Sequence, residues 1–158
     1  MTPYHERLDA TGELLTLAVR GGHDEAALDR IRALYGDLSD EEVFEATRTN
    51  KVTHAVADAL ERSLGDELPA PWREALAENE SRVEALLDMT EGLTGRLTAL
   101  GIPSAAVESA GVLLGSDLPT RALGSGDLDL LVPQADWGRS LELAAELGLV
   151  QGAREGQV

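Results

Sequence analysis

Two aspartates, Asp127 and Asp129, stand one residue apart near the end of the chain, in the stretch GSGDLDLLVP at residues 124–133. In a β-strand, side chains two residues apart point to the same face, so both carboxylates would project together, with Leu128 and Leu130 opposite. Two carboxylates on one face can share a hard divalent cation such as Mg²⁺. In phosphoryl and nucleotidyl transfer, the cation neutralises the phosphates and activates the attacking oxygen.

The D-x-D spacing leaves a second interpretation open. The chain has 29 acidic residues, so two neighbouring carboxylates can also be the solvated edge of an ordinary strand. Gly124 and Gly126 lie in the turn before the strand, where they would let a phosphate approach the backbone closely. The residues therefore predict either a cation site or an acidic strand edge.

The order of elements around the aspartates resembles the uncharacterised nucleotidyltransferase family of the nucleotidyltransferase superfamily. The similarity rests on GIP at residues 101–103, on TRALGSGDLDLLVP at residues 120–133, and on the predicted helix that ends at ELGLV, residues 146–150. The helical stretches before them also resemble the family, so that the similarity covers roughly residues 10–150. It implies metal-dependent transfer of a nucleotide monophosphate to an acceptor.

The resemblance also implies roles for individual residues. Asp127 and Asp129 fall on the family's catalytic, metal-binding pair, and Arg121 falls on the arginine that precedes the pair. The superfamily holds nucleotide phosphates with a Gly-Ser pair at a helix start, and Gly115 and Ser116 stand at a workable spacing before the aspartates. We therefore expect Mg²⁺ or Mn²⁺ and a nucleoside triphosphate as cofactors.

Two departures from the family pattern favour an alternative in which catalysis is impaired. Where the family has Lys-Gly, this chain has Glu108 and Ser109, so a negative charge replaces a positive one beside the phosphates. The superfamily takes a third carboxylate from a later strand, whereas the sequence after Gly148 offers Glu155 without a recognisable strand. The chain would then be a piece of a longer protein, or a noncatalytic relative that acts as a binding or accessory protein or as a homo-oligomeric scaffold.

Net charge narrows the choice of partners. The chain has 13 basic residues against 29 acidic ones, a net charge of -16. A negative field of this size repels nucleic-acid backbones and anionic membranes, so we expect neither nonspecific nucleic-acid binding nor membrane binding. A metal–nucleotide complex stays compatible, because the cation supplies positive charge locally. An unfinished sheet would leave a strand edge exposed, which favours a protein partner or a homo-oligomer.

Other chemistry finds little support in the residues. The chain has no cysteine, which excludes disulfides and thiolate metal sites. It shows no P-loop, dinucleotide-binding or zinc pattern, and its serines have no histidine and acid in motif context. It also has neither an apolar run of ~18–20 residues nor the order of a signal peptide. We therefore expect a cytoplasmic protein.

Histidines and tryptophans are expected in structural positions. His5, His23 and His54 have no paired ligand spacing, so each is expected on the surface or on a helix face. Trp72 and Trp137 are expected to anchor packing.

The elements that must position these residues are mainly helical. Hydrophobic residues make up 43% of the chain and aromatic ones 3%, so leucine, alanine and valine must form most of the core. Apolar spacing predicts helices over most of residues 1–100, with Asp24 and Ser39 as N-caps. Gly92 and Gly95 are weak points of the longest helix, where a break or kink is expected.

After residue 100 the pattern changes. It predicts a short strand, a short helix, a loop, the strand DLDLLVP and a helix that ends at Gly148. We therefore predict an α+β, mainly α protein. A helical region at residues 1–100 precedes a minimal nucleotidyltransferase-like αβ unit at residues 101–158, which is incomplete if the chain is a fragment.

Overall fold

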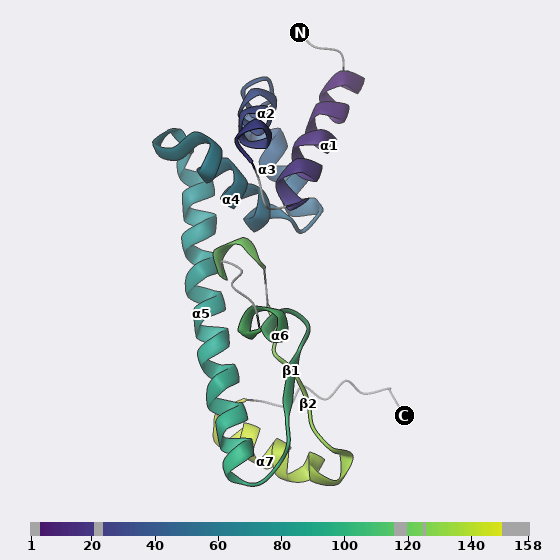
Figure 1. The fold of residues 1–158 in the computed structure, drawn as a ribbon, viewed down its shortest axis with the longest axis vertical. Helices are drawn as coiled ribbons and strands as arrows, with labels where there is room; N and C mark the ends of the chain where they lie inside the picture. Colours follow the sequence, from purple (N-terminus) through teal and green to yellow (C-terminus); the bar gives the residue numbers. More distant parts are fainter. Residues whose placement is uncertain (1–3, 21–23, 116–119, 125, 150–158) are drawn as a thin grey trace. The chain divides into compact units, whose positions relative to one another are not determined.

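The described part of the protein is mainly helical, as predicted. The computed structural model describes residues 4–20, 24–115, 120–124 and 126–149 (Figure 1). Within these ranges the chain forms seven α-helices and one two-stranded antiparallel sheet. None of the helices in this part of the chain is both long enough and apolar enough to span a bilayer.

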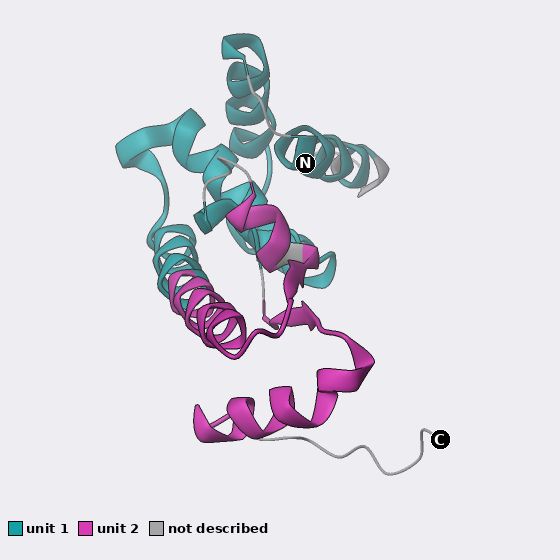
Figure 2. Cartoon of the chain, turned by 60° about the horizontal axis from the view of Figure 1, so that its bottom comes forward, with its two compact units in different colours: residues 1–83, 118–125 teal, residues 84–117, 126–158 magenta. Residues whose placement is uncertain are grey.

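The chain divides into two compact units (Figure 2). Unit 1 contains residues 1–83 and 118–125, and unit 2 contains residues 84–117 and 126–158. The long helix α5 (Ala70–Ala99) contributes to both. The boundary predicted at residue 100 falls at the end of α5, and as a domain boundary it stays a prediction.

Unit 1 is a set of short helices around one apolar core. Two predicted N-caps form: the Asp24 side chain accepts a hydrogen bond from the backbone nitrogen of Ala27 at 2.9 Å, and that of Ser39 from Glu42 at 3.5 Å. These caps satisfy nitrogen atoms that lack partners inside the helices. The helices and the 3₁₀ turn of this unit before α5 are α1 (Tyr4–Arg20), α2 (Glu25–Gly36), α3 (Asp40–Thr49), α4 (Thr53–Leu64) and η1 (Gly65–Glu67).

Trp72 lies at the centre of the unit 1 core, which confirms its predicted packing role. Its side chain is fully buried, and its ring meets Phe44 edge-on at a centroid distance of 4.8 Å. Its Nε1 donates hydrogen bonds to the Tyr35 hydroxyl at 2.9 Å and to Oδ1 of Asp40 at 2.5 Å. Burial raises the pKa of Tyr35, and its hydrogen bond to Asp40 raises it further. The buried indole thus has its polar atom satisfied.

Unit 2 contains a sheet of two short strands together with helices. Strands β1 (Ala105–Val107) and β2 (Asp129–Leu131) pair antiparallel (Figure 1). In the register of this pair, Val107 lies opposite Asp129. The other elements of this unit after α5 are α6 (Glu108–Leu114), the 3₁₀ turn η3 (Gln134–Asp136) and α7 (Trp137–Glu146).

The apolar core of unit 2, here called the second core, includes two leucines of α5 beside the glycines where a break was expected. The helix runs through Gly92 and Gly95 without the expected break. Both glycines are exposed. Leu93 and Leu97, four residues apart on one face of α5, are buried in a cluster with Ile102 and Leu143. Burial of these leucines offsets the low helix propensity of the two glycines, about 1 kcal/mol each.

Candidate functional site

The two aspartates lie at the start of β2 in unit 2. The strand begins at Asp129, so Asp127 precedes it, and the predicted strand DLDLLVP is shorter than expected. Leu128, Leu130 and Val132 pack against the second core, as the alternation of the sequence predicted for the face opposite Asp129. Asp127 is exposed and Asp129 is half-buried, so each carboxylate is open to solvent to a different degree.

Asp127 borders an apolar groove of about 520 Å³ within unit 2. Among the described residues that line this groove, Asp127 is the one with a charge, and Asp129 does not line it. A volume of this size lies within the range of small-molecule sites. The apolar walls come from α5, from the segment around β2 and from α7; they include Leu86, Met89, Leu93, Leu128, Leu130, Trp137 and Leu141.

Trp137 stands in the wall of this groove, and the prediction that it anchors packing was wrong. Its side chain is 55% exposed, and it lines the groove from the first position of α7. Met89, on α5, is also partly exposed, at 42%. The groove therefore offers an aromatic face and a thioether to a ligand.

The carboxylates of Asp127 and Asp129 are suitable ligands for a hard cation, but two ligands do not complete its coordination. Carboxylate oxygens are the ligands that Mg²⁺ prefers, and Mg²⁺ usually takes one or two carboxylates together with water and substrate phosphates. Within the described ranges, no three acidic or histidine side chains gather closely enough to hold a metal ion. The two aspartates would therefore need the oxygens of a nucleotide to complete the coordination.

Arg121 lies in unit 1, where two carboxylates of α4 bind it. It belongs to a 3₁₀ turn, η2 (Thr120–Ala122). Its Nε donates to Oδ1 of Asp58 at 3.1 Å, and its Nη2 donates to Oε2 of Glu61. Burial lowers the pKa of Arg121, but the two carboxylates outweigh this and raise it overall. Its charge is thus balanced inside unit 1, and its predicted contact with a nucleotide stays a prediction.

Asn79 fixes the same turn from α5. Its side chain is fully buried, and its Nδ2 donates to the carbonyl oxygens of Arg121 and Leu123, both at 3.0 Å. Its Oδ1 accepts a hydrogen bond from Nη2 of Arg82 at 2.7 Å. The buried amide thus has its polar atoms hydrogen-bonded, and it ties α5 to the backbone of this turn.

His54 lies on helix α4, as expected, and it also belongs to this cluster. Its Nε2 lies 3.4 Å from Nη2 of Arg82, and its ring packs on Gly124. A Cβ atom at position 124 would lie 2.9 Å from Cδ2 of His54, so any other residue there would require the imidazole to shift. His23, and the side chain of His5, lie outside the described residues.

Gly115, the first residue of the predicted phosphate-binding pair, lies at the end of a helix and not at the start that was expected. Gly115 is the C-cap of α6, and a helix C-terminus carries a negative partial charge, which disfavours phosphate. Ser116 lies outside the described residues. Glu108, which stands where the family has lysine, begins α6 with a φ of 54°, a strained value for a non-glycine residue. A role for Gly115 and Ser116 in nucleotide binding stays a prediction.

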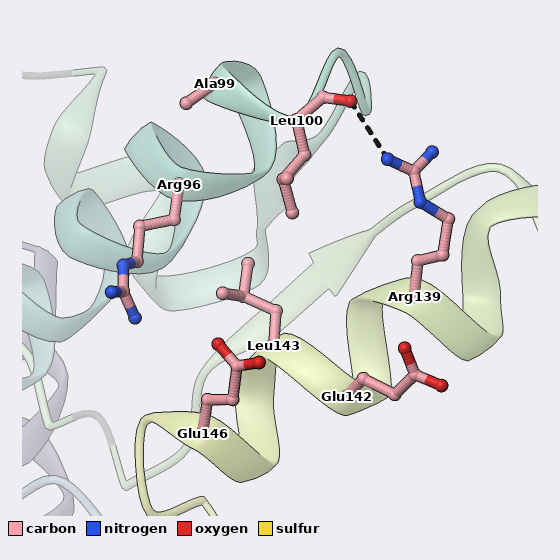
Figure 3. A pocket seen from close by; sticks show the side chains of 7 residues that line it. All are labelled: Arg96, Ala99, Leu100, Arg139, Glu142, Leu143 and Glu146. Carbon is pink, nitrogen blue, oxygen red and sulfur yellow. Dashed lines mark hydrogen bonds between the residues drawn. The ribbon is translucent and has the colours of Figure 1, made fainter.

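A second hollow in unit 2, of about 410 Å³, lies between the end of α5 and α7 (Figure 3). Arg139 lines it and donates from Nη2 to the carbonyl oxygen of Leu100 at 3.2 Å. Arg96 contributes a second positive charge, whereas Glu142 and Glu146 contribute two negative ones. Because these charges balance, the hollow does not favour an anion such as phosphate.

Sequence reasoning missed Asn79, although the sequence carries a signal for it. Trp72, Leu76, Asn79 and Val83 follow one another at the spacing of one helix face. A polar residue in such an apolar stripe must find buried hydrogen-bond partners. Here the partners come from residues more than 40 positions further along the chain, which the spacing itself does not reveal.

The resemblance to nucleotidyltransferases rests on the sequence motifs around Arg121, Asp127 and Asp129. Comparison with known proteins finds no matching family model, no matching curated protein and no matching solved structure for this chain.

Proposed function

We propose that this protein is nucleotidyltransferase-like and binds a divalent cation together with a nucleoside triphosphate at Asp127 and Asp129. The observation that carries the proposal is the position of Asp127 at the border of an apolar groove within unit 2. A carboxylate beside a groove of this size can bind the cation of a metal–nucleotide complex while the groove accepts the base. The resemblance to the family supports the same pair of residues.

The groove suits a nucleobase better than it suits a phosphate chain. Its walls are apolar and include the partly exposed rings and side chains of Trp137 and Met89. Aromatic faces stack on bases of any sequence. The phosphates would stay outside the apolar walls, where the cation compensates their charge against a chain with a net charge of -16. The cation would then activate the attacking oxygen of an acceptor.

A second candidate function is binding without transfer. Arg121 is bound to Asp58 and Glu61, so its charge is already compensated and is not ready to stabilise phosphates. Glu108 takes the place of the family's lysine. Both observations favour a noncatalytic relative, which would use the same groove for a nucleotide or another ligand and would act as a binding or accessory protein.

Calorimetry tests the metal–nucleotide site. We expect the wild-type protein to bind nucleoside triphosphates in the presence of Mg²⁺ or Mn²⁺ and to lose this affinity when EDTA removes the cation. Asp127→Asn and Asp129→Asn should each weaken binding by about tenfold or more, because each removes a charged ligand. Asp88→Asn is the matched control, since Asp88 is also an exposed carboxylate of unit 2 but does not line the groove.

The outcomes separate the two candidates. Binding that needs both aspartates, together with release of pyrophosphate, supports a nucleotidyltransferase. Binding without pyrophosphate release supports the noncatalytic relative. Absence of binding, or binding equal in the wild type and in the Asp127→Asn/Asp129→Asn double variant, would contradict the metal site.

A further inference from the structure

Residues 120–124, here called the strap segment, belong to unit 1 and are bound to its helices α4 and α5 by three separate contacts. Arg121 forms ion pairs with two carboxylates of α4. Asn79 of α5 donates hydrogen bonds to carbonyl oxygens of the segment. Gly124 packs on the ring of His54. The strap segment stands immediately before residue 125 and the D-x-D stretch in the sequence.

The contact between His54 and Arg82 is a hydrogen bond only when the imidazole is neutral. Arginine can only donate hydrogen bonds, so Nε2 of His54 accepts from Nη2 of Arg82 across 3.4 Å. The proton of the neutral ring is therefore on Nδ1. That atom is buried and finds no hydrogen-bond partner among the described residues. The ring is consequently held by packing and by one contact that requires it to be uncharged.

We propose that His54 makes the strap segment a pH-sensitive latch, which is closed while the imidazole is neutral and is released when the imidazole becomes protonated. A protonated ring cannot accept from Arg82 and places a second positive charge 3.4 Å from that guanidinium. Arg82 also binds Oδ1 of Asn79, so a displaced Arg82 disturbs the amide that anchors the strap segment.

The surroundings of His54 on balance oppose its protonation. Burial lowers the pKa of His54 most, Arg82 on α5 lowers it further, and Glu78 on the same helix raises it by a smaller amount. On the strap segment the charged group is Arg121, which is paired with the α4 carboxylates Asp58 and Glu61.

Because the pKa of His54 is lowered in the closed state, acid pH favours release of the strap segment. A released His54, with an ordinary pKa of about 6.5, binds a proton more readily than the held one. Closure is therefore fully stabilised above about pH 6.5 and weakens as the pH falls toward the lower pKa of the closed state. For one proton, the ratio of released to closed molecules rises by at most about tenfold between pH 7.5 and pH 5.5.

Hydrogen exchange measured by mass spectrometry tests the latch on the full chain without any ligand. The exchange rate of peptides covering residues 120–124 is divided by the intrinsic rate at the same pH, with peptides from α2 as the internal reference. We expect the normalised rate to rise several-fold, up to about tenfold, between about pH 7.5 and pH 5.5. His54→Phe keeps a flat ring on Gly124 and cannot titrate, so its normalised rate should not change with pH.

Two results would overturn the latch. One is a wild-type normalised rate that does not change over this pH range, and the other is an equal rise in His54→Phe, which would assign the effect to other groups. If His54→Phe does not fold, NMR titration of the wild-type imidazole decides instead. A pKa of His54 at or above about 6.5 in the folded protein contradicts the latch, whereas a lower value with a matching shift of the strap-segment signals supports it.

Discussion

Nε of Arg121 lies 3.1 Å from Oδ1 of Asp58, two residues separated by 63 positions in the sequence. The contact binds a loop residue to helix α4 within unit 1. Because the Asp58 side chain is only 11% exposed and that of Arg121 30%, water compensates either charge poorly when its partner is removed. This ion pair is therefore expected to contribute to stability, unlike a fully exposed one.

Asp58→Ala should destabilise the protein by about 1–3 kcal/mol, because it leaves the half-buried guanidinium of Arg121 with one carboxylate instead of two. Urea denaturation measures the effect, and a double-mutant cycle with Arg121→Met isolates the pair. The control is Glu13→Ala, which breaks the exposed ion pair with Arg30 and should have a much smaller effect. A coupling energy near zero in the cycle would show that the pair is not important for stability.

Asn79→Leu should cost about 2–3 kcal/mol, although leucine is of similar size and more apolar. The carbonyl oxygens of Arg121 and Leu123 would lose the donor on which they depend, and Arg82 would lose its acceptor. The same denaturation assay measures the loss.

Asn79→Asp separates the hydrogen bonds that Asn79 donates to the two carbonyl oxygens from the one that it accepts from Arg82. It retains an acceptor for Arg82 but directs carboxylate oxygens at the two carbonyls. We expect it to be destabilising as well; stability equal to the wild type would show that only the contact with Arg82 matters.

Tryptophan substitutions should separate a core position from a groove position. Trp72 is fully buried and Trp137 is 55% exposed, so Trp72→Ala should cost about 3–5 kcal/mol and Trp137→Ala about 1 kcal/mol or less. If the groove accepts a base, Trp137→Ala should nevertheless weaken nucleotide binding in the calorimetric assay. Equal destabilisation by both substitutions would contradict the different burial of the two rings.

Local patterns in the sequence predicted local structure well. Asp24 and Ser39 cap their helices because an N-cap depends on residues only three positions apart. The alternation of Leu128, Leu130 and Val132 likewise predicted the face that meets the core. Such signals need no knowledge of distant contacts, and they account for the mainly helical fold and the position of β2.

Long-range contacts could not be predicted in this way. The surroundings of Arg121 depend on Asp58 and Glu61, which nothing in the spacing of TRALGSG reveals. His54 was expected on a helix face, and its contact with Gly124 depends on a loop 70 positions later in the sequence. The metal-binding role of Asp127 and Asp129 depends on ligands that the described part of the chain does not contain, so it stays a prediction.

Two helical glycines should respond to alanine in opposite directions. A Cβ atom at Gly111 in α6 would lie 2.5 Å from the carbonyl oxygen of Ala106, the residue in β1 against which the helix packs. Backbone cannot move aside as a flexible side chain can, so Gly111→Ala should cost about 1–3 kcal/mol. Gly92 in α5 is exposed, and a Cβ atom there would meet nothing within 4 Å, so Gly92→Ala should stabilise the protein by up to about 1 kcal/mol.

Urea denaturation of both variants provides the comparison, with Gly95→Ala as a second exposed position in α5. The opposite signs follow from one difference: at residue 111 the added methyl group meets a strand, and at residues 92 and 95 it meets solvent. Because α6 and β1 both belong to unit 2, the loss in Gly111→Ala should also be seen as faster hydrogen exchange in residues 105–114. Unchanged stability in Gly111→Ala would mean that α6 does not pack on Ala106 as closely as the structure shows.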